Sequence, residues 1–536
     1  MSRHFAKIGI TLVILIFLGE YRQAQGQAQA QNSPTSSPQG PSSGNFGPLS
    51  PPVPIDQEYL QWPLPANDKA YGSIDGRKLK TYVEDLVAIP ERYRDQGHQF
   101  WGRITGSSAD TETQQWLTEK FKTAGVSDIR VQTIDLAPQW NPTSWSVDVA
   151  GGDKTITLKT AQPVMSTQST PLGGLDLEVA YVGLGSEADY IGRDVRGKAV
   201  FIYSATHNHQ QTTALTERAT LLAEKKGAAA IFFSMSIPGN VRWELYNPGT
   251  HVPTFTTGLE DGLAVRSLVV NSENGAAPRV HIQLNVEMTP NEKTATIWAT
   301  LPGRTSEKIY FVCHRDGFFD GAVDNASGMA TMIGLAEYFA KIPKEKRRRT
   351  IVFVSTTGHH SNGENGRPHV SVSGVWIAQN HEEVFKDTAL LINLEHTATV
   401  QTAYYLPQPV IRKTNAQSEA LFWFVHGSPL LEKTFFNDLR EFGVPVYDEP
   451  DRAAYGEIQD YAKYAPSVQA TNFGTYSHSD HETADMVPWT GLEGVTRAYA
   501  KFVEDVNAID TKDLEAATAA TDKLSAPGTA NGPNGR

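Results

Sequence analysis

Apolar, strand-like segments alternate with helix-like segments through the second half of this 536-residue chain, and this alternation limits the possible folds most. Short apolar runs at 309–313, 351–354 and 389–394 are typical of buried strands. Apolar residues at helical spacing follow the first run, and a helical pattern at 376–385 precedes the third. Strands that alternate with helices predict a mostly parallel sheet with helices on both faces. We therefore expect an α/β fold with a mixed, mostly parallel sheet sandwiched by helices.

Composition and charge exclude several classes of protein. The chain is 40% hydrophobic and 20% charged, which is typical of a globular protein. Its net charge of −12 argues against electrostatic binding of nucleic acid. The single cysteine, Cys313, excludes an intrachain disulfide framework and every cysteine-based zinc site. Stability must therefore come from a large apolar core.

The two ends of the chain differ from the rest. Residues 1–26 combine Arg3 and Lys7 with a short apolar stretch, a pattern typical of a secretory signal peptide, with an uncleaved N-terminal anchor as the alternative. Polar, small and proline residues dominate 27–54 and 511–536, where we expect a disordered linker and a disordered tail. We expect an exported protein, periplasmic or extracellular, with no membrane span after signal cleavage.

The sequence pattern changes between residues 173 and 288, which indicates an inserted domain. The sequence there predicts strands on either side of a helix at 213–226. The runs DVRGKAVFIYS and KKGAAAIFFSM resemble the protease-associated (PA) domain that is inserted into several exported peptidases. The resemblance implies that 55–172 and 289–510 form one discontinuous domain around a PA-like insert. An unrelated small α/β insert is the alternative.

Side chains that can bind metal follow three of the predicted strands. These are His314 and Asp316 after the first strand, His359 and His360 after the second, and Glu395 and His396 after the third. Asp324, at the start of a helix, and His478, in a distant loop, add further groups. Because the carboxyl ends of parallel strands meet at one edge of a sheet, we expect these side chains to lie close together. Zn²⁺ binds imidazole and carboxylate where thiolate is absent, so a zinc site is predicted.

Some of these groups have simpler interpretations. A single histidine or aspartate at a strand end is usually a hydrogen-bonding residue, and only the coincidence of several indicates a metal site. His396 is expected to point away from Glu395, because neighbours on a strand face opposite sides.

Two motifs resemble the M28 family of dinuclear zinc exopeptidases, which includes aminopeptidases and glutamate carboxypeptidase-like proteins. The run HRDGFFDGAVDNASGMATMIGLAEYFA resembles the first metal motif of the family, and YSHSDHETADMV resembles the last. The resemblance implies that His314 binds one zinc, Asp316 orients His314, Asp324 bridges two zincs, Glu395 is a terminal ligand and His478 binds the second zinc.

The main departure from the family is the pair His359-His360, which replaces an adjacent Glu-Glu pair. His360 can replace a carboxylate ligand, whereas His359 stands at the position of the general base. A histidine that accepts a proton there becomes a cation beside two dications. With Asp324 and Glu395 as the only carboxylate ligands, the second zinc should bind less tightly. Glu364, in a glycine-bounded loop, is an alternative proton acceptor.

The sequence predicts an exported, metal-dependent exopeptidase that hydrolyses peptide bonds through a zinc-activated water, with aminopeptidase activity as the first hypothesis. The alternative is a catalytically impaired M28-like protein that acts in binding or scaffolding, as the pair His359-His360 suggests. A third possibility is a different metal-dependent hydrolase or acyl transferase on the same scaffold.

Overall fold

The computed structural model describes most of the chain beyond its N-terminal segment. The described residues are 60–208, 211–237, 239–272, 275–361, 371–405, 410–447, 454–472 and 474–515. All of them lie within one unit, Ile55–Arg536. The predicted signal peptide and linker, Glu364 and most of the predicted tail lie outside the described residues.

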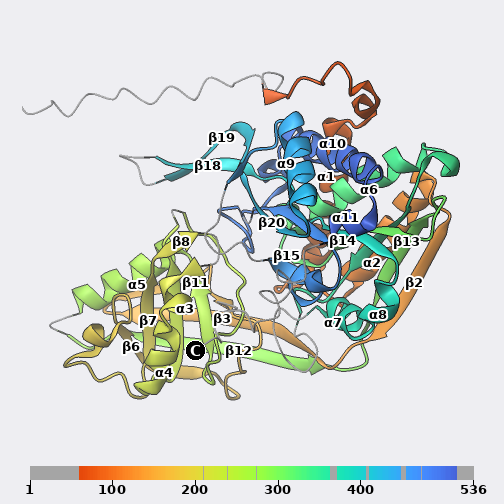
Figure 1. Cartoon of the computed structure of the whole chain (residues 1–536). Coiled ribbons are helices and arrows are strands. Elements are labelled where there is room, and N and C mark those ends of the chain that lie inside the picture. Colours follow the sequence, from red (N-terminus) through yellow and green to blue (C-terminus); the bar gives the residue numbers. More distant parts are fainter. Residues whose placement is uncertain are drawn as a thin grey trace, which may run out of the picture. The chain divides into compact units, whose positions relative to one another are not determined.

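A mixed eight-stranded sheet carries the three predicted strands (Figure 1). In the order of the sheet, the strands are β2 (Asp128–Asp135), β13 (Lys293–Leu301), β16 (Thr350–Thr356), β14 (Lys308–His314), β17 (Thr388–Asn393), β22 (Ser467–Thr471), β20 (Leu421–His426) and β21 (Val446–Tyr447). The central strands β16, β14, β17 and β22 run parallel, whereas β13 and β20 pair antiparallel with their inner neighbours. The carboxyl ends of β16, β14 and β17 therefore lie side by side.

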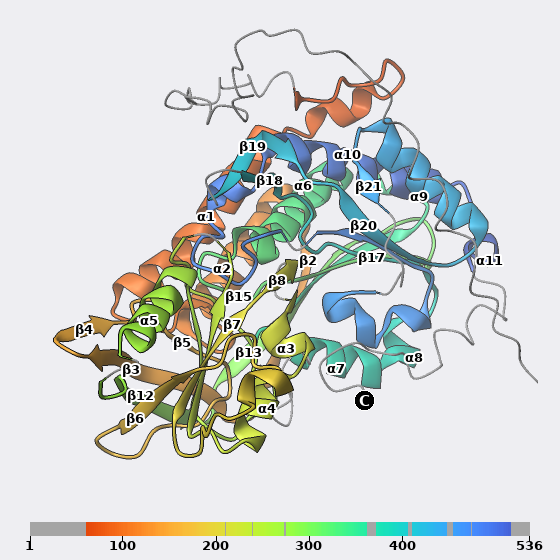
Figure 2. The ribbon, with the colours of Figure 1, turned by 90° about the vertical axis from the view of Figure 1, so that its left-hand side faces the viewer.

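Helices cover both faces of this first sheet (Figure 2). One face carries α1 (Gly76–Asp95), α2 (Ser108–Ala124), α6 (Gly328–Ala340), α9 (Pro429–Glu441) and α10 (Trp489–Val506), and the other carries α7 (Val372–Gln379) and α8 (His381–Val384). Phe311 of β14 packs into the core shared with α6, whereas Tyr310 and Val312 pack into a core shared with Ile377 of α7. Successive strand residues face opposite sides, so an uninterrupted apolar strand fills both cores. The predicted α/β fold is confirmed.

A second eight-stranded sheet contains most of the predicted insert. In the order of the sheet, its strands are β4 (Lys154–Thr157), β3 (Gln139–Gly151), β12 (Arg279–Thr289), β6 (Leu175–Tyr181), β7 (Ala199–Ser204), β10 (Ala230–Met235), β11 (Thr254–Thr257) and β5 (Gln162–Pro163). The sheet thus takes in strands from before residue 173, because β3 pairs along the whole length of β12. Stacked rings of Phe201, Phe232 and Phe255, with centroids 4.3 and 5.1 Å apart, fill its centre.

Two local predictions differ from the structure. The expected helix at 213–226 is divided into α3 (Thr213–Thr216) and α4 (Ala219–Lys225), because Arg218 adopts a left-handed φ of 56°. The tail expected to be disordered from residue 511 begins with the short helix α11 (Thr511–Leu514). Leu514 is fully buried, and its carbonyl accepts a hydrogen bond from the Ser428 amide at 2.9 Å.

None of the helices in the described part of the chain combines the length and apolar character that crossing a bilayer requires.

A buried ion pair fixes the loop after β14 to helix α2. Arg315 Nε donates to Asp110 Oδ1 at 2.8 Å, and both side chains are at most 1% exposed. The hydroxyl of Thr294 donates to the other oxygen of Asp110 at 2.6 Å. Because His314 precedes Arg315 directly, this pair also anchors the end of the strand that carries a predicted metal ligand.

Replacing Asp110 by asparagine should destabilise the fold strongly, because it leaves the Arg315 charge buried without a counter-charge. We expect a loss of about 3–5 kcal/mol in the free energy of unfolding, measured from urea denaturation followed by tryptophan fluorescence. The control is Asp194→Asn, which removes a surface ion pair with Arg196 and should leave the unfolding midpoint unchanged. Equal midpoints for the two variants would contradict this account of the loop.

Candidate metal centre

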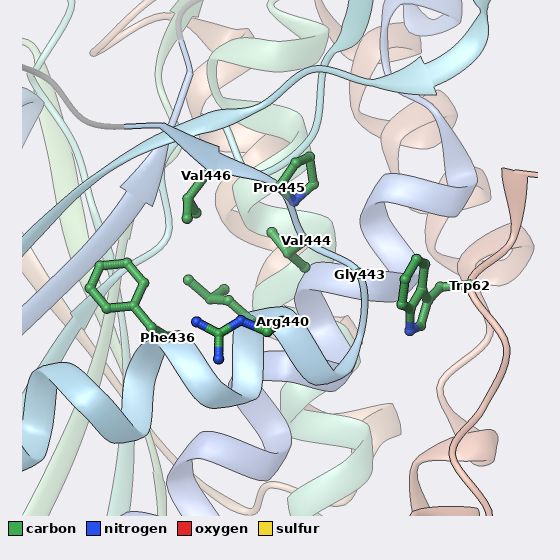
Figure 3. A pocket seen from close by; sticks show the side chains of 8 residues that line it. Trp62, Phe436, Arg440, Gly443, Val444, Pro445 and Val446 are labelled. Atoms are coloured by element: carbon green, nitrogen blue, oxygen red, sulfur yellow. The ribbon is translucent and has the colours of Figure 1, made fainter.

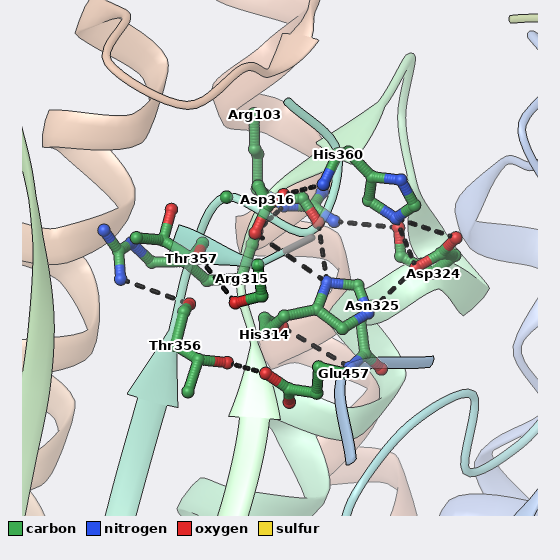
Figure 4. A network of polar contacts seen from close by, with 12 residues as sticks. Arg103, His314, Arg315, Asp316, Asp324, Asn325, Thr356, Thr357, His360 and Glu457 are labelled. Atoms are coloured by element: carbon green, nitrogen blue, oxygen red, sulfur yellow. Dashed lines mark hydrogen bonds and ion pairs between the residues drawn. The ribbon is translucent and has the colours of Figure 1, made fainter. Parts of the chain in front are cut away.

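Four imidazoles converge on the carboxylate of Asp324. Nε2 of His314 and Nε2 of His396 lie 3.3 and 3.0 Å from Oδ1, and Nε2 of His478 lies 2.9 Å from Oδ2. Nε2 of His360 lies between the two oxygens, 3.1 Å from Oδ2 and 3.2 Å from Oδ1. All five side chains are at most 3% exposed. Figure 4 shows His314, His360 and Asp324 facing one another.

Two of the groups of ligand-type atoms have only Asp324 in common. His314, Asp324 and His396 form one group, and Asp324, His360 and His478 form the other. Within each group, the three atoms that could bind a metal lie within 4.8 Å of one another. The rings of His360 and His478 also lie close together, with centroids 4.6 Å apart. The arrangement offers two neighbouring metal positions on one shared carboxylate.

The sheet topology brings these residues together. His314 ends β14, while His360 and His396 follow β16 and β17, the strands on either side of it. Asp324 lies in the kinked helical turn Ala322–Ser327 directly before α6, and His478 lies in the loop between β22 and α10. The centre therefore sits beyond the carboxyl ends of the parallel strands, where α/β proteins commonly place their sites.

His396 is a ligand candidate that the sequence analysis placed on the wrong side. The strand β17 ends at Asn393, and His396 has a left-handed φ of 48°, so the alternation of a strand no longer applies to it. His478 also has a left-handed φ, of 64°. Non-glycine residues rarely adopt this conformation, which costs about 1–3 kcal/mol and is concentrated at functional sites. Both turns aim an imidazole at Asp324.

Glu395 lies at the edge of the cluster. Its Oε1 is 3.9 Å from Nε2 of His314, and its Oε2 accepts hydrogen bonds from Asn393 at 2.8 Å and Gln469 at 3.3 Å. Burial and the nearby carboxyl of Glu457 raise the pKa of Glu395 well above its usual value. Glu395 therefore lies close enough for a bound metal ion to affect its ionisation, but it belongs to neither of the two groups that share Asp324.

Glu457 is a second buried carboxyl, and no motif in the sequence pointed to it. It accepts a hydrogen bond from the Thr356 hydroxyl and lies beside His314 in Figure 4. Burial raises the pKa of Glu457 to about 8. Its position depends on the 3-10 turn Gly456–Asp460, far along the chain from the strand that it contacts.

His359 lies against both groups. Its ring centroid is 4.6 Å from that of His314 and 4.7 Å from that of His360, and its side chain is 6% exposed. These three residues form a further group whose nitrogen atoms lie within 4.8 Å of one another. An ion bound there would take one imidazole from each of the two groups on Asp324, so the two modes of binding exclude each other.

Protonation states at the centre suit a metal ion. Burial lowers the pKa of His314 well below its usual value and that of His478 to about 4. Burial opposes ionisation of Asp324, but the imidazoles of His360 and His396 outweigh it and hold the pKa of that carboxyl well below its usual range. Metal binding requires neutral imidazoles beside an ionised carboxylate. His314 and His478 meet this condition, whereas Asp324 raises the pKa of His360, so a metal bound there must displace a proton.

Hydrogen bonds orient the histidines and fix their backbones. Nδ1 of His314 lies 3.1 Å from the carbonyl oxygen of Asp316, so an Nδ1–H donor leaves the Nε2 lone pair facing Asp324. The Asp316 carboxylate, which we expected to orient His314, instead accepts a hydrogen bond from the His360 amide and lies 3.9 Å from Nδ1 of His314.

Glu482 and Arg103 hold the backbone of the centre. One carboxylate oxygen of Glu482 accepts the Asp324 amide at 2.5 Å, and the other accepts the His478 amide at 2.9 Å. The fully buried guanidinium of Arg103 donates to the carbonyls of Arg315, Asp320, Gly321 and Asp324 at 2.7–3.3 Å. Glu482 belongs to the last sequence motif, whereas no sequence signal distinguished Arg103.

Two cavities of the described part of the protein differ in their relation to the metal centre. The larger, of about 310 Å³, is remote from these histidines; its lining residues are Trp62, Phe436, Leu439, Arg440, Gly443, Val444, Pro445 and Val446 (Figure 3). It contains no carboxylate or imidazole and offers no groups for acid–base chemistry. The smaller, of about 40 Å³, reaches His360 and Ser361 and is lined by Tyr93, Phe100 and Trp140 among other residues. It gives the metal centre an aromatic-lined neighbouring space.

Comparison with known proteins gives a family match for part of the chain. Residues 296–503 match the sequence model of peptidase family M28. Over these residues the chain is similar to M28 peptidases. All five residues of the Asp324 cluster fall within the matched range.

Curated relatives of this chain are distant. It is 22% identical over 290 residues to probable leucine aminopeptidase 2 of Trichophyton verrucosum, with 53% of this chain and 54% of that protein covered. Identity to the protein of the same name from Arthroderma benhamiae is 21%, with the same coverage. The chain spans about half the length of the curated relatives it matches.

Solved structures share the fold of this chain. A peptidase M28 precursor from Shewanella amazonensis SB2B has a TM-score of 0.60 at 15% identity, covering 82% of this chain and 97% of that one. BSAP, a zinc aminopeptidase from Bacillus subtilis, has a TM-score of 0.57 at 15% identity, covering 82% of this chain and 98% of that one. The similarity extends well beyond residues 296–503.

The competing ligand assignments, His396 and Glu395, can be separated by metal analysis. We expect His396→Ala to lose one of two bound metal equivalents, because the atoms of His396 but not of Glu395 converge with those of His314 and Asp324. Glu395→Gln, which keeps the shape of the side chain, should retain both equivalents. Elemental analysis of protein purified without chelator measures this. Loss of metal from Glu395→Gln but not from His396→Ala would contradict the assignment.

Proposed function

We propose that this protein is a dinuclear zinc aminopeptidase. One zinc would be held by His314, His396 and Asp324, and the other by Asp324, His360 and His478. The observation that carries the proposal is the meeting of two otherwise separate ligand groups at one buried carboxylate. The M28 match and the fold shared with a zinc aminopeptidase support it.

The donor set of this centre fits zinc better than a harder metal. Four imidazole nitrogens and one carboxylate suit zinc, whereas magnesium and calcium prefer oxygen ligands. The five groups carry one negative charge, compared with the two expected if Glu395 were also a ligand. We propose that Glu395 and Glu457 compensate, because nearby dications favour ionisation of buried carboxyls that would otherwise stay protonated.

Bound zinc supplies Lewis acidity and makes a nucleophilic water available at neutral pH. Asp324 and the four histidines would hold the metal pair in a buried site. His359, which contacts the rings of His314 and His360, is our candidate for holding the proton that the water gives up and returning it to the leaving amine. The positive charge of the two zincs would disfavour protonation of His359. Ionised Glu395 and Glu457 would offset part of this effect.

Peptides are the proposed substrates. The small cavity beside His360 is lined partly by aromatic side chains. This cavity would accommodate a small group of a peptide substrate. The names of the curated relatives make leucine the first amino-terminal residue to test. The charge and apolar pattern of residues 1–26 support the further proposal that the protein acts outside the cytoplasm.

A second candidate function is binding or scaffolding without hydrolysis. The observation that favours it is His359 itself, because no carboxylate occupies its position between the rings of His314 and His360. The peptidase proposal and this alternative predict different outcomes for variants at position 359.

Activity on leucine anilides and short peptides between pH 6 and 9 tests the proposal. We expect zinc-loaded protein to release the amino-terminal residue, chelator to stop the reaction and zinc to restore it. His359→Ala should lower kcat by about 10²–10⁴-fold at unchanged metal content, since it removes the proton carrier but none of the proposed ligands.

The control for this experiment is Asp324→Asn, which should lose both metal binding and activity. Inactive wild-type protein with two bound zincs, together with activity gained by His359→Glu, would overturn the peptidase proposal in favour of the binding function.

A further inference from the structure

A segment that connects two strands of the second sheet reaches into the metal centre and contacts two of the histidines on Asp324. This segment, Val241–Tyr246, lies between β10 and β11. The hydroxyl of Tyr246 lies 2.6 Å from Nδ1 of His360, and the Glu244 amide donates to the carbonyl of His478 at 2.9 Å. His360 and His478 are the two imidazoles of one ligand group.

Backbone pairing extends this contact along the His478 loop. Trp243 forms an antiparallel bridge with Ser479. The Asp480 amide donates to the carbonyl of Arg242 at 3.1 Å, and the Arg242 amide donates to Oδ1 of Asp480 at 3.0 Å. The loop that carries His478 is thus paired to the segment Val241–Tyr246 as a short strand would be.

The segment is itself firmly anchored in the second sheet. Trp243 is fully buried, and its carbonyl accepts a hydrogen bond from the Thr256 hydroxyl at 2.7 Å. Buried Glu244 accepts a hydrogen bond from the Gln162 side chain at 2.6 Å. The ring of Tyr246 packs against Phe318 and His478, with centroids 6.0 Å away in both cases. Tyr246 therefore has a fixed position from which to orient His360.

The other ligand group is supported from the first sheet. Nδ1 of His314 faces the carbonyl of Asp316, and the His396 amide donates to Oδ1 of Asn325 at 3.1 Å. Both partners lie in the loop and turn that follow β14. The two metal positions therefore differ in what holds their histidines, although they share Asp324.

The contact with Tyr246 also bears on the chemistry of His360. A neutral imidazole carries one N–H, and it binds a metal only through the other nitrogen. When Nδ1–H of His360 donates to the phenolic oxygen, the lone pair of Nε2 points toward Asp324. Partners of this kind fix the tautomer and ring orientation of metal-binding histidines and typically change metal affinity by 10–100-fold.

We infer that Tyr246 is a positioning residue that holds His360 in its metal-binding tautomer, so that the second sheet controls one of the two metal positions and not the other. This inference rests on the proposed dinuclear centre. It gives the second sheet a direct role in assembling the site.

The test is a zinc titration of the full chain against a competing chelator, with Tyr246→Phe as the variant. We expect one of two dissociation constants to rise by about 10–100-fold while the other stays unchanged. The matched control is Tyr190→Phe, in the 3-10 turn Glu187–Tyr190, which removes a buried hydroxyl that has no hydrogen-bond partner among the described residues. This control should leave both constants unchanged.

Double variants assign the weakened position. Tyr246→Phe combined with His360→Ala should bind no less zinc than His360→Ala alone, because both changes act on the same position. Tyr246→Phe combined with His396→Ala should lose affinity at the single position that remains. These readouts depend on metal binding and not on turnover.

The outcomes separate this inference from the proposed function. If Tyr246→Phe keeps both wild-type constants, or weakens both equally, the role of Tyr246 is overturned while the dinuclear centre stands. If the wild-type protein itself binds fewer than two zinc ions, the dinuclear centre fails and the inference fails with it.

Discussion

The shared carboxylate of Asp324 is the interaction on which the rest of the site depends. Burying an ionised carboxylate is costly unless nearby groups compensate for its charge. Four imidazoles surround this one, and Glu482 and Arg103 fix the backbone on which it stands. Without metal, a proton shared with His360 can compensate the charge, and with metal the ions take over that role. The fold thus places a carboxylate and four imidazoles where cations can bind.

The proposed function divides the chemistry of the centre between its histidines and its carboxyls. Each histidine offers a zinc ligand without adding negative charge. In this proposal, the centre relies on imidazole nitrogen for affinity and on the buried carboxyls of Glu395 and Glu457 for charge. Proton transfer is assigned to His359, an imidazole beside the metal positions. The proposal therefore joins metal binding and catalysis to the same few histidines.

Much of the first sheet could be predicted because its strands are short, apolar and buried on both faces. The same pattern predicted that His314, His360 and the residues after β17 lie close together, since side chains after neighbouring parallel strands meet at one edge of the sheet. His396 was misplaced because a single left-handed residue after β17 reverses the direction of its side chain. Local alternation cannot reveal such a turn, which depends on the packing of the whole loop.

Residues from distant parts of the chain could not be predicted at all. Arg103, Glu457 and Tyr246 reach the centre from a short strand, a 3-10 turn and the second sheet, and none belongs to a motif. Their roles arise from tertiary contacts across the fold. The same holds for the start of the second sheet, where β3 joins β12 only through long-range pairing.

The most direct test of the central claim is a crystal structure of the zinc-loaded protein with anomalous scattering recorded at the zinc edge. The account predicts two zinc peaks about 3.5–4 Å apart, one on each side of the Asp324 carboxylate. A single peak held by His314, His359 and His360, with Asp324 unligated, would contradict it.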